Sequence, residues 1–267
     1  MSLMELRMRP HLSASAINDY CSCSLYYKFS RVDKLEREFT SDALVFGSSI
    51  HKALEVFHRA RMMGGKLSQE EFIESFEHYW RTGAEDREDI QYKKGKNFQV
   101  LLNEGKALLR VFYEKSSDED LKIIAVEESF SFSIDGLPLP VIGAVDVVLE
   151  DQAGIIIISD FKTSSKSYSA QQIDQNAQMT IYSMAARANG FADREILLRL
   201  DVLVKTKVPK YEIYYTVRDE EEMSRAAKKI LAVYRGIQSE VFIPNDQGNW
   251  KCSCCEFRQA CEQWHES

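Results

Sequence analysis

The chain has 267 residues, of which 45% are hydrophobic and 28% charged, and its formal net charge is −7. This composition is that of a folded protein, and it excludes a disordered chain and one that coats nucleic acid through bulk positive charge. The longest apolar runs, such as residues 154–159, fall far short of the roughly 18 residues that a membrane span needs, and residues 1–10 lack a signal-peptide core. We therefore expect a cytoplasmic protein with one elaborated domain over residues 1–267, in which any nucleic-acid site is local.

Helices are predicted to dominate the first 117 residues. Small polar residues from Ser13 onward can cap a short helix that continues as a second turn to Phe29. A longer helix fits residues 43–63 and stops at Gly64-Gly65. Two more helices, at 69–80 and 97–113, belong to a helical elaboration over about residues 60–118.

Strands are predicted to dominate from residue 120 onward. The first contains Val126, Phe130 and Phe132 and turns at Asp135-Gly136, a strong hairpin signal. The remaining strands and helices are expected at 141–149 (strand), 155–159 (strand, buried on both faces), 171–189 (helix), 196–204 (strand), 211–217 (strand) and 220–237 (amphipathic helix). The fold class is therefore α+β: a mixed sheet of about five strands flanked by helices, with an N-terminal helical region and a C-terminal cysteine cluster.

Two carboxylates and a lysine are expected to meet on neighbouring strands. Asp146 lies in the middle of the second strand, and Asp160, at the end of the third, shares a face with Lys162 because residues two apart point the same way. Paired carboxylates suit Mg²⁺ or Mn²⁺, and a neighbouring lysine can stabilise negative charge on a phosphate. The pattern favours phosphodiester cleavage. The alternative is a surface ion pair of Asp160 with Lys162 and an edge-strand charge at Asp146, because D-x-K alone is too short to be specific.

The surrounding motifs resemble a known nuclease family. The run G-A-V-D at 143–146, followed after one turn by I-I-S-D-F-K-T at 157–163, resembles the metal-binding core of the PD-(D/E)XK nucleases, in particular the RecB-like exonuclease branch. That branch also carries a G-x-x-x-H helix upstream and a Q-x-x-x-Y helix after the lysine. This sequence has both, at 47–51 and 178–182, in the same order. The resemblance implies a restriction-endonuclease-like core.

The resemblance also implies roles for the matching residues. Asp146 and Asp160 would bind the metal, the second standing where many relatives have Glu, and Lys162 would be the catalytic lysine. His51 would be an additional metal ligand through a neutral ring nitrogen. An isolated histidine on a helix is otherwise more often a surface or packed residue.

The Q-x-x-x-Y motif would act on the substrate side of the same site. By resemblance, Gln178 and Tyr182 would position the substrate strand or the lysine. The ordinary alternative is that a Gln and a Tyr four residues apart merely share one face of a helix.

The six cysteines form two groups, Cys21 with Cys23 and four more from Cys252 to Cys261. Thiolates spaced as in Cys252-x₂-Cys255-x₅-Cys261 are ligands that soft metals and iron–sulfur clusters select, but a fourth ligand is missing locally. AddB-type and CRISPR-associated members of the RecB-like branch take it from an N-terminal S-x-S-x₄-Y-x₂-C segment, which residues 13–23 resemble. One departure is Ser24, which stands where a proline often follows that cysteine.

This resemblance implies a [4Fe–4S] cluster that joins segment 250–262 to the N-terminal region as a structural staple. The expected ligands are Cys23, Cys252, Cys255 and Cys261, with Cys21 and Cys254 as non-ligands. Zinc is the main alternative, since Cys21-x-Cys23 and Cys252-x₂-Cys255 would make two short pairs, although Cys261 would then lack a role. A disulfide framework fits less well, because no secretory signal is evident.

Two local basic clusters could contact nucleic acid. They are Y-K-K-G-K at 92–96 and Lys205-x-Lys207-x-x-Lys210 on a predicted hairpin, near Tyr211, Tyr214 and Tyr215. Such a mixture could follow a phosphate backbone and stack on bases. The ordinary alternative for each cluster is a solvated loop.

These features lead to one expected function and two alternatives. We expect a metal-dependent DNA exonuclease acting on single-stranded or unwound ends in repair, recombination or CRISPR adaptation, with a helicase or CRISPR-adaptation protein as a partner. The first alternative is a non-catalytic iron–sulfur DNA-binding or scaffolding subunit of a helicase–nuclease complex. The second is a zinc-bound regulatory module in which the D-x-K match is accidental.

Overall fold

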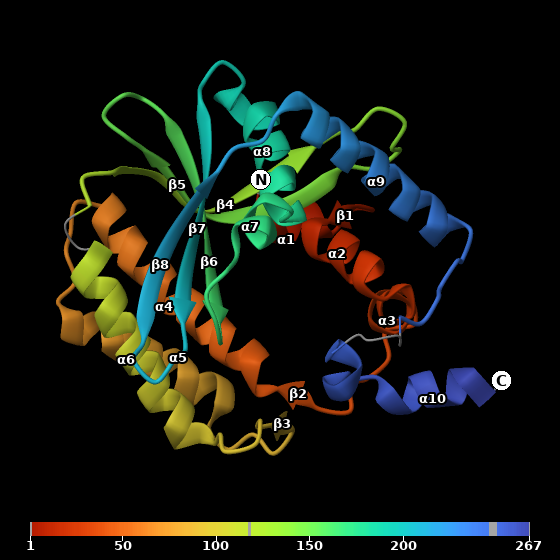
Figure 1. Ribbon diagram of the computed structural model, residues 1–267, viewed down its shortest axis with the longest axis horizontal. Coiled ribbons are helices and arrows are strands. Elements are labelled where there is room, and N and C mark those ends of the chain that lie inside the picture. The colour runs from red at the N-terminus through yellow and green to blue at the C-terminus, as the bar shows by residue number, and fades with distance from the viewer. Residues whose placement is uncertain (1, 117–118, 246–249, 267) are drawn as a thin grey trace.

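A mixed sheet with helices on both faces forms the centre of the computed structural model, which describes residues 2–116, 119–245 and 250–266 (Figure 1). The strands of the main sheet are β1 (Leu12–Ser13), β4 (Lys122–Phe132), β5 (Val141–Glu150), β6 (Ile156–Ser164), β7 (Ile196–Val204) and β8 (Lys210–Thr216). Their order is β1-β5-β6-β7-β8, with β4 on the other edge of β5. A second, two-stranded sheet pairs β2 (Thr40–Ser41) with β3 (Ile90–Gln91).

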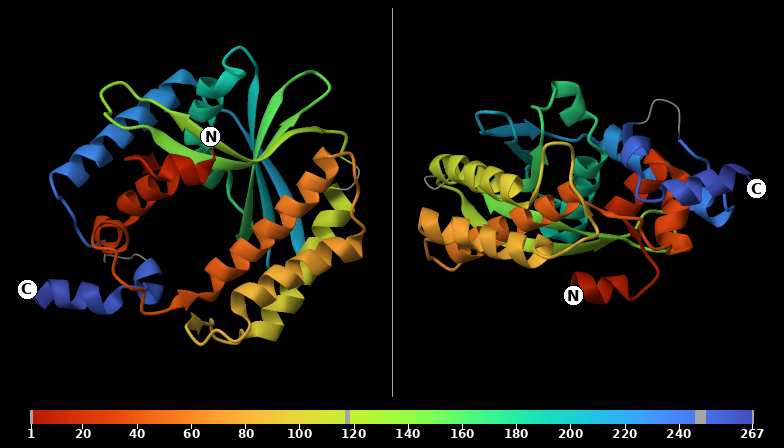
Figure 2. Two further views of the ribbon diagram at one scale, coloured as in Figure 1. Left: turned by 180° about the vertical axis from the view of Figure 1, so that it is seen from behind. Right: turned by 90° about the horizontal axis from the view of Figure 1, so that it is seen from below.

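The five longest described helices form two layers. Helices α4 (Asp42–Met62), α5 (Gln69–Ala84) and α6 (Phe98–Ser116) cover one face of the sheet, and α8 (Ala177–Ala186) with α9 (Glu220–Gln238) covers the other (Figures 1 and 2). The other helical segments are α1 (Leu3–Arg7), α2 (Ala14–Ser22), α3 (Ser24–Tyr27), the π-helical η1 (Lys28–Val32) and η2 (Arg187–Phe191), α7 (Ala170–Asp174), the 3₁₀ turn η3 (Trp250–Cys254) and α10 (Arg258–Glu266). No described helix combines the length and the apolar composition that a membrane crossing requires.

Alternation along the strands creates a separate hydrophobic core on each face. In β6, Ile157 and Phe161 pack in the core under α4, α5 and α6, while Ile156 and Ile158 pack in the core under α8 and α9. A strand buried on both faces reads as a continuous apolar run, and this is why residues 155–159 identify β6 in the sequence. The α+β class and the mixed sheet flanked by helices are confirmed.

Three details differ from the sequence predictions. Strand β6 continues to Ser164, so Asp160 lies within the strand and not at its end. The helix expected at 171–189 is divided, because the side chain of Asn176 accepts the backbone N–H groups of Gln178 and Met179 and begins α8 as a new helix. The short strand β1 also adds a sixth strand to the expected sheet of about five.

The C-terminal segment lies beside the N-terminal helices (Figure 2). Leu25 and Phe29 pack against Phe257 in a third, small hydrophobic core. Backbone hydrogen bonds also link the two regions, from Leu25 N to Ile243 O at 3.2 Å and from Glu38 N to Glu256 O at 3.0 Å. Segments more than 200 residues apart in the sequence therefore form one structural unit.

His58 on α4 is a buried histidine that the fold keeps neutral. Its ring stacks on Phe161 with the centroids 5.4 Å apart, and neither ring nitrogen has a hydrogen-bond partner in the described part of the chain. Burial lowers the pKa of His58 to about 3. In the unfolded chain His58 has a pKa of about 6.5, so below that pH the unfolded chain binds a proton at this residue. The folded chain stays unprotonated there.

We predict that His58→Phe reduces the loss of stability in mild acid. The contribution of this histidine is complete above pH 6.5 and is lost as the pH falls, so the wild type should lose about 2 kcal/mol from this group by pH 5. Phenylalanine cannot take up the proton. Urea unfolding at pH 7 and pH 5 measures the difference, and an equal loss of unfolding free energy in both proteins would contradict the assignment.

Candidate active site

The candidate site lies where one edge of β5 loses its strand partner. On this edge, residues 147–150 pair with β6 and residues 141–142 pair with β1, whereas no described strand pairs with residues 143–146. Buried backbone groups need hydrogen-bond partners, so side chains must replace the missing strand. We call this interval of β5 and the facing residues of β6 the sheet gap.

Asp146 satisfies the first backbone group in the sheet gap. Its Oδ2 accepts a hydrogen bond from the backbone N–H of Phe161 at 2.7 Å, which takes the place of a rung between β5 and β6. Its other oxygen, Oδ1, lies 3.3 Å from Nδ1 of His51 on α4. The structure thus brings His51 and Asp146 together although 95 residues separate them.

Asp160 and Lys162 approach the gap from β6, on the face that α8 covers. Asp160 is 1% exposed, and its Oδ2 lies 2.6 Å from Nζ of Lys162, an ion pair in which that oxygen accepts no directed hydrogen bond. The hydroxyl of Tyr182 lies 3.3 Å from Asp160 Oδ1 and 3.0 Å from the carbonyl oxygen of Ala144. The Tyr182 hydroxyl therefore contacts both the buried carboxylate of Asp160 and the backbone of the gap at Ala144.

Gln178 completes this arrangement from one turn earlier on α8. Its side-chain amide donates a hydrogen bond to the Tyr182 hydroxyl at 2.6 Å. The contacts run from Gln178 to Tyr182 and on to Asp160, and the expectation that the two residues position the substrate strand or the lysine stays a prediction.

The charges in the gap shift one another's protonation. Burial raises the pKa of Asp160, and repulsion from Asp146 adds to this against the attraction of Lys162. Burial acts the same way on Asp146, but its hydrogen bond with His51 and the charges of His51 and Lys162 outweigh burial and lower its pKa. For Lys162 and His51, burial is outweighed by the carboxylates, so both pKa values are raised. The carboxylates of the gap therefore favour the positively charged forms of Lys162 and His51.

The donor set fits a divalent cation. Asp160 keeps a buried oxygen without a directed hydrogen bond, and Asp146 and His51 present an oxygen and a nitrogen 3.3 Å apart. Two octahedral ligands at about 2.1 Å from one Mg²⁺ lie about 3.0 Å apart, close to this separation. As the side chains stand, no three His, Cys, Asp or Glu residues in the described ranges are grouped as a ready metal site. Metal binding would require Asp160 to exchange Lys162 for the cation.

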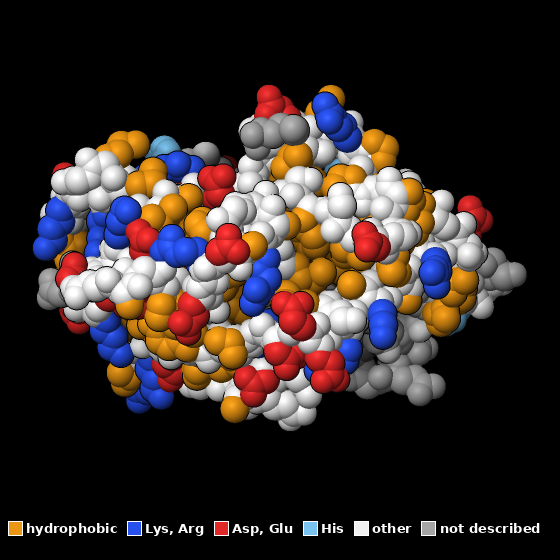
Figure 3. Space-filling view, turned by 90° about the horizontal axis from the view of Figure 1, so that it is seen from above, with side chains coloured by type: hydrophobic (Ala, Val, Ile, Leu, Met, Phe, Trp, Pro, Cys, Tyr) orange, Lys and Arg blue, Asp and Glu red, His pale blue; other side chains and the backbone are white. Residues whose placement is uncertain are grey.

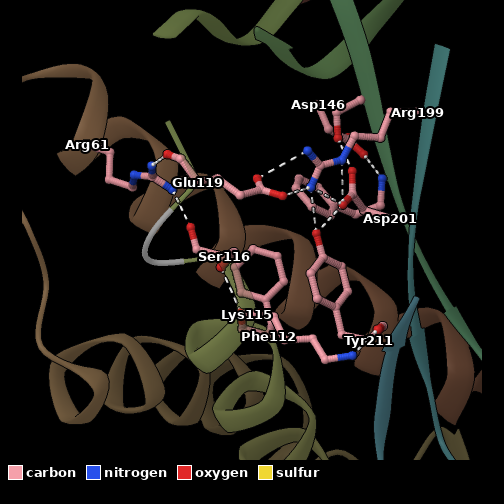
Figure 4. Close-up of polar contacts among 11 residues, drawn as sticks. Arg61, Phe112, Lys115, Ser116, Glu119, Asp146, Arg199, Asp201 and Tyr211 are labelled. Carbon is pink, nitrogen blue, oxygen red and sulfur yellow. Dashed lines mark hydrogen bonds and ion pairs between the residues drawn. The ribbon is translucent and has the colours of Figure 1, made fainter. Parts of the chain in front are cut away.

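A buried ionic network supports β6 on the opposite face, which α4 and α6 cover (Figure 4). Arg199 on β7 donates hydrogen bonds to Asp201 Oδ1 at 3.0 Å and to Glu119 Oε1 at 2.9 Å. It also donates a hydrogen bond to the hydroxyl oxygen of Tyr211. The hydroxyl of Ser159, next to Asp160 in the chain, donates to Asp201. Because a buried ion pair is costly to break, this network holds β6 against β7 while its other edge is open.

Sequence reasoning missed this network and one further carboxylate. The pairing of Val126 with Val147 and of Glu128 with Val145 places Glu127 opposite Asp146. Glu127 has a φ of 53°, a left-handed conformation that is unusual within a strand, and burial, followed by the charge of Asp146, raises its pKa. The signal was present, since two adjacent glutamates break the alternation of a strand.

The cysteines gather at the other end of the molecule. The four predicted cluster ligands are half-buried and line a single cavity of about 380 Å³: Cys23, Cys252, Cys255 and Cys261. Cys21 and Cys254 are exposed, and none of the six cysteines, all of which are described, forms a disulfide. Burial raises the pKa of the Cys255 thiol, and the neighbouring Cys23 and Cys261 add to this. The four thiols therefore share one cavity, and as the side chains stand they are not grouped as a ready metal site among the described residues.

Charge is mixed over the surface. On the face shown in Figure 3, Lys and Arg side chains are interspersed with Asp and Glu and do not gather in one basic patch. This agrees with the net charge of −7 and leaves nucleic-acid binding to local features.

Comparisons with known proteins agree with this architecture. The model of the PD-(D/E)XK nuclease superfamily matches residues 11–262. The crystal structure of a protein named "Putative exonuclease", from Eubacterium rectale, is similar with a TM-score of 0.57 and 14% identity, over 92% of this chain and 86% of that one, which shows a shared fold. The crystal structure of SSO0001 shares 14% identity over 90% of this chain and 94% of that one, with a TM-score of 0.40, too low to argue from. No curated protein matches the sequence.

Proposed function

Because this chain belongs to the PD-(D/E)XK nuclease superfamily, we propose that it is a Mg²⁺- or Mn²⁺-dependent deoxyribonuclease of the RecB-like branch that degrades DNA from its ends. The supporting observation is the sheet gap, where Asp146 contacts His51 and accepts the N–H of Phe161, and where the neighbouring Asp160 pairs with Lys162.

Each residue in the gap has a distinct part in phosphodiester hydrolysis. A divalent cation, when bound, supplies positive charge that activates water and stabilises the phosphate oxygens. Asp146, Asp160 and His51 would hold it. Lys162 would move from Asp160 toward the scissile phosphate and stabilise the charge that develops there. Tyr182, through its contact with Asp160 Oδ1, would keep that carboxylate directed into the gap.

We further propose that residues 1–267 act as a single nuclease domain in the cytoplasm, with α5 and α6 within the elaboration at about residues 60–118. Its substrate would be single-stranded or unwound DNA ends in repair, recombination or CRISPR adaptation. The acidic chain favours a partner, a helicase or a CRISPR-adaptation protein, that supplies additional positive surface.

A [4Fe–4S] cluster held by Cys23, Cys252, Cys255 and Cys261 is proposed to connect the two ends of the domain. The four thiols share one cavity beside the small core of Leu25, Phe29 and Phe257. That core is small, so a metal centre that binds the folded state alone would add stability where burial provides little. Zinc, the alternative, would use the same cavity.

We predict that Asp160→Ala and Lys162→Ala abolish Mg²⁺- or Mn²⁺-dependent DNA cleavage while the fold is retained. Lys166→Ala, an exposed lysine on the loop after β6, is the matched control and should cleave like the wild type. Cleavage of an end-labelled oligonucleotide, with circular dichroism to check folding, measures both effects. Near wild-type cleavage by a folded Asp160→Ala protein would exclude Asp160 as a metal ligand.

The same assay separates the enzyme from a non-catalytic subunit. A wild-type protein that binds DNA but does not cleave it, with either metal and with its thiol centre intact, would favour the scaffolding role over the nuclease.

We predict that Cys23→Ser removes the brown iron–sulfur chromophore and lowers the melting temperature, whereas Cys21→Ser does neither. Cys23 lines the shared cavity and Cys21 is exposed, so only the first change removes a ligand. Anaerobic purification with iron, zinc and sulfide analysis is the measurement. Finding zinc but no sulfide would show that the site binds zinc and not an iron–sulfur cluster. Loss of the chromophore in Cys21→Ser but not in Cys23→Ser would identify Cys21 as the ligand.

A further inference from the structure

The two basic clusters of the sequence meet in one small cavity. It has a volume of about 130 Å³ and lies between the start of α4, the segment before α6 and the turn after β7. Three of its lining residues are lysines: Lys93 and Lys96 from the first cluster and Lys205 from the second. We call this cavity the lysine pocket.

Lys205 is the central residue of the lysine pocket. Its side chain is half-buried, with Nζ 4.8 Å from the centre of the Phe46 ring, and no carboxylate of the described residues lies within ion-pairing distance. Burial lowers the pKa of Lys205, and repulsion from Lys93 and Lys96 contributes to the shift. Ammonium groups that repel one another in a cavity are stabilised when an anion binds among them.

Two acidic residues, Asp42 and Glu104, also line the pocket, and Oε2 of Glu104 is buried without a hydrogen-bond partner among the described residues. Glu104 forms an ion pair with Lys96, and Oδ2 of Asp42 accepts the backbone N–H of Lys93 at 3.0 Å. Three lysines against two carboxylates leave a positive charge of one, and α4 directs the positive end of its dipole to the same place. The pocket is therefore suited to an anion.

The lysine pocket lies beside the sheet gap. The backbone N–H of Lys205 donates to the carbonyl of Ser164, which is two residues beyond Lys162 on β6. Along α4, Phe46 precedes His51 by five residues, which is about 7.5 Å of helix. Along either route, roughly 7 Å of strand or helix separates the pocket from the sheet gap.

We infer that the lysine pocket binds a backbone phosphate of the DNA strand being cleaved, close to the scissile phosphate. This inference rests on the proposed nuclease function, and it names where the strand is held. A phosphate here would neutralise the lysines and fix the strand in register with the sheet gap, so binding energy remote from the reacting bond would position that bond.

The test compares Lys205→Gln with Lys228→Gln, which removes one charge from an exposed position on α9, outside both basic clusters. Glutamine keeps much of the stem that packs on Phe46, and Lys205→Arg restores the charge. Binding of a fluorescent single-stranded oligonucleotide is measured by anisotropy with EDTA over a series of salt concentrations, and cleavage is measured separately with Mn²⁺.

We predict that Lys205→Gln weakens oligonucleotide binding by about tenfold and lowers the salt slope by about 0.7, the value for one phosphate contact on a single strand. KM should rise with little change in kcat, Lys205→Arg should recover most of the binding, and Lys228→Gln should match the wild type. Equal behaviour of Lys205→Gln and Lys228→Gln, or a wild type that does not bind the oligonucleotide, would contradict phosphate binding in the lysine pocket. A wild type that binds through Lys205 but does not cleave would support the pocket and refute the nuclease.

Discussion

One hydrogen bond, from the backbone N–H of Phe161 to the carboxylate of Asp146, determines the geometry of the candidate site. It replaces a rung of the sheet at the position where β5 and β6 stop pairing, after Val147 and Ser159. A buried N–H without a partner costs about 1–3 kcal/mol, so the carboxylate removes a substantial penalty for separating the strands here. The residue that opens the sheet also presents its second oxygen to His51.

The two faces of β6 have different roles: one carries the candidate site residues and the other the buried ionic network. Asp160 and Lys162 point toward α8, where Tyr182 contacts the buried carboxylate. The alternate residues point toward α4, where Ser159 joins the Arg199 network. One edge of β6 is therefore fixed to β7 along its full length, while the other edge is free to form the sheet gap. A rigid strand beside an opening is a suitable support for ligands that must hold a metal at fixed distances.

The sequence predicts what is local and periodic. Apolar alternation and helix caps identify β5, α4 and α9 to within a few residues, and the spacing of the D-x-K motif indicates a shared face. Features that depend on contacts between distant segments cannot be predicted from local sequence patterns. The unpaired edge of β5 at residues 143–146, the position of Glu127 opposite Asp146, and the meeting of Lys93 with Lys205 arise only when distant segments come together.

The central claim is that the sheet gap binds a divalent cation, and the most direct measurement is anomalous X-ray scattering from a crystal of the protein soaked in Mn²⁺. The account predicts one strong peak about 2.0 to 2.3 Å from an oxygen of Asp146, an oxygen of Asp160 and a ring nitrogen of His51. Lys162 should then have moved away from Asp160. A map with no peak in the gap, with Asp160 still paired to Lys162 at saturating Mn²⁺, would contradict it.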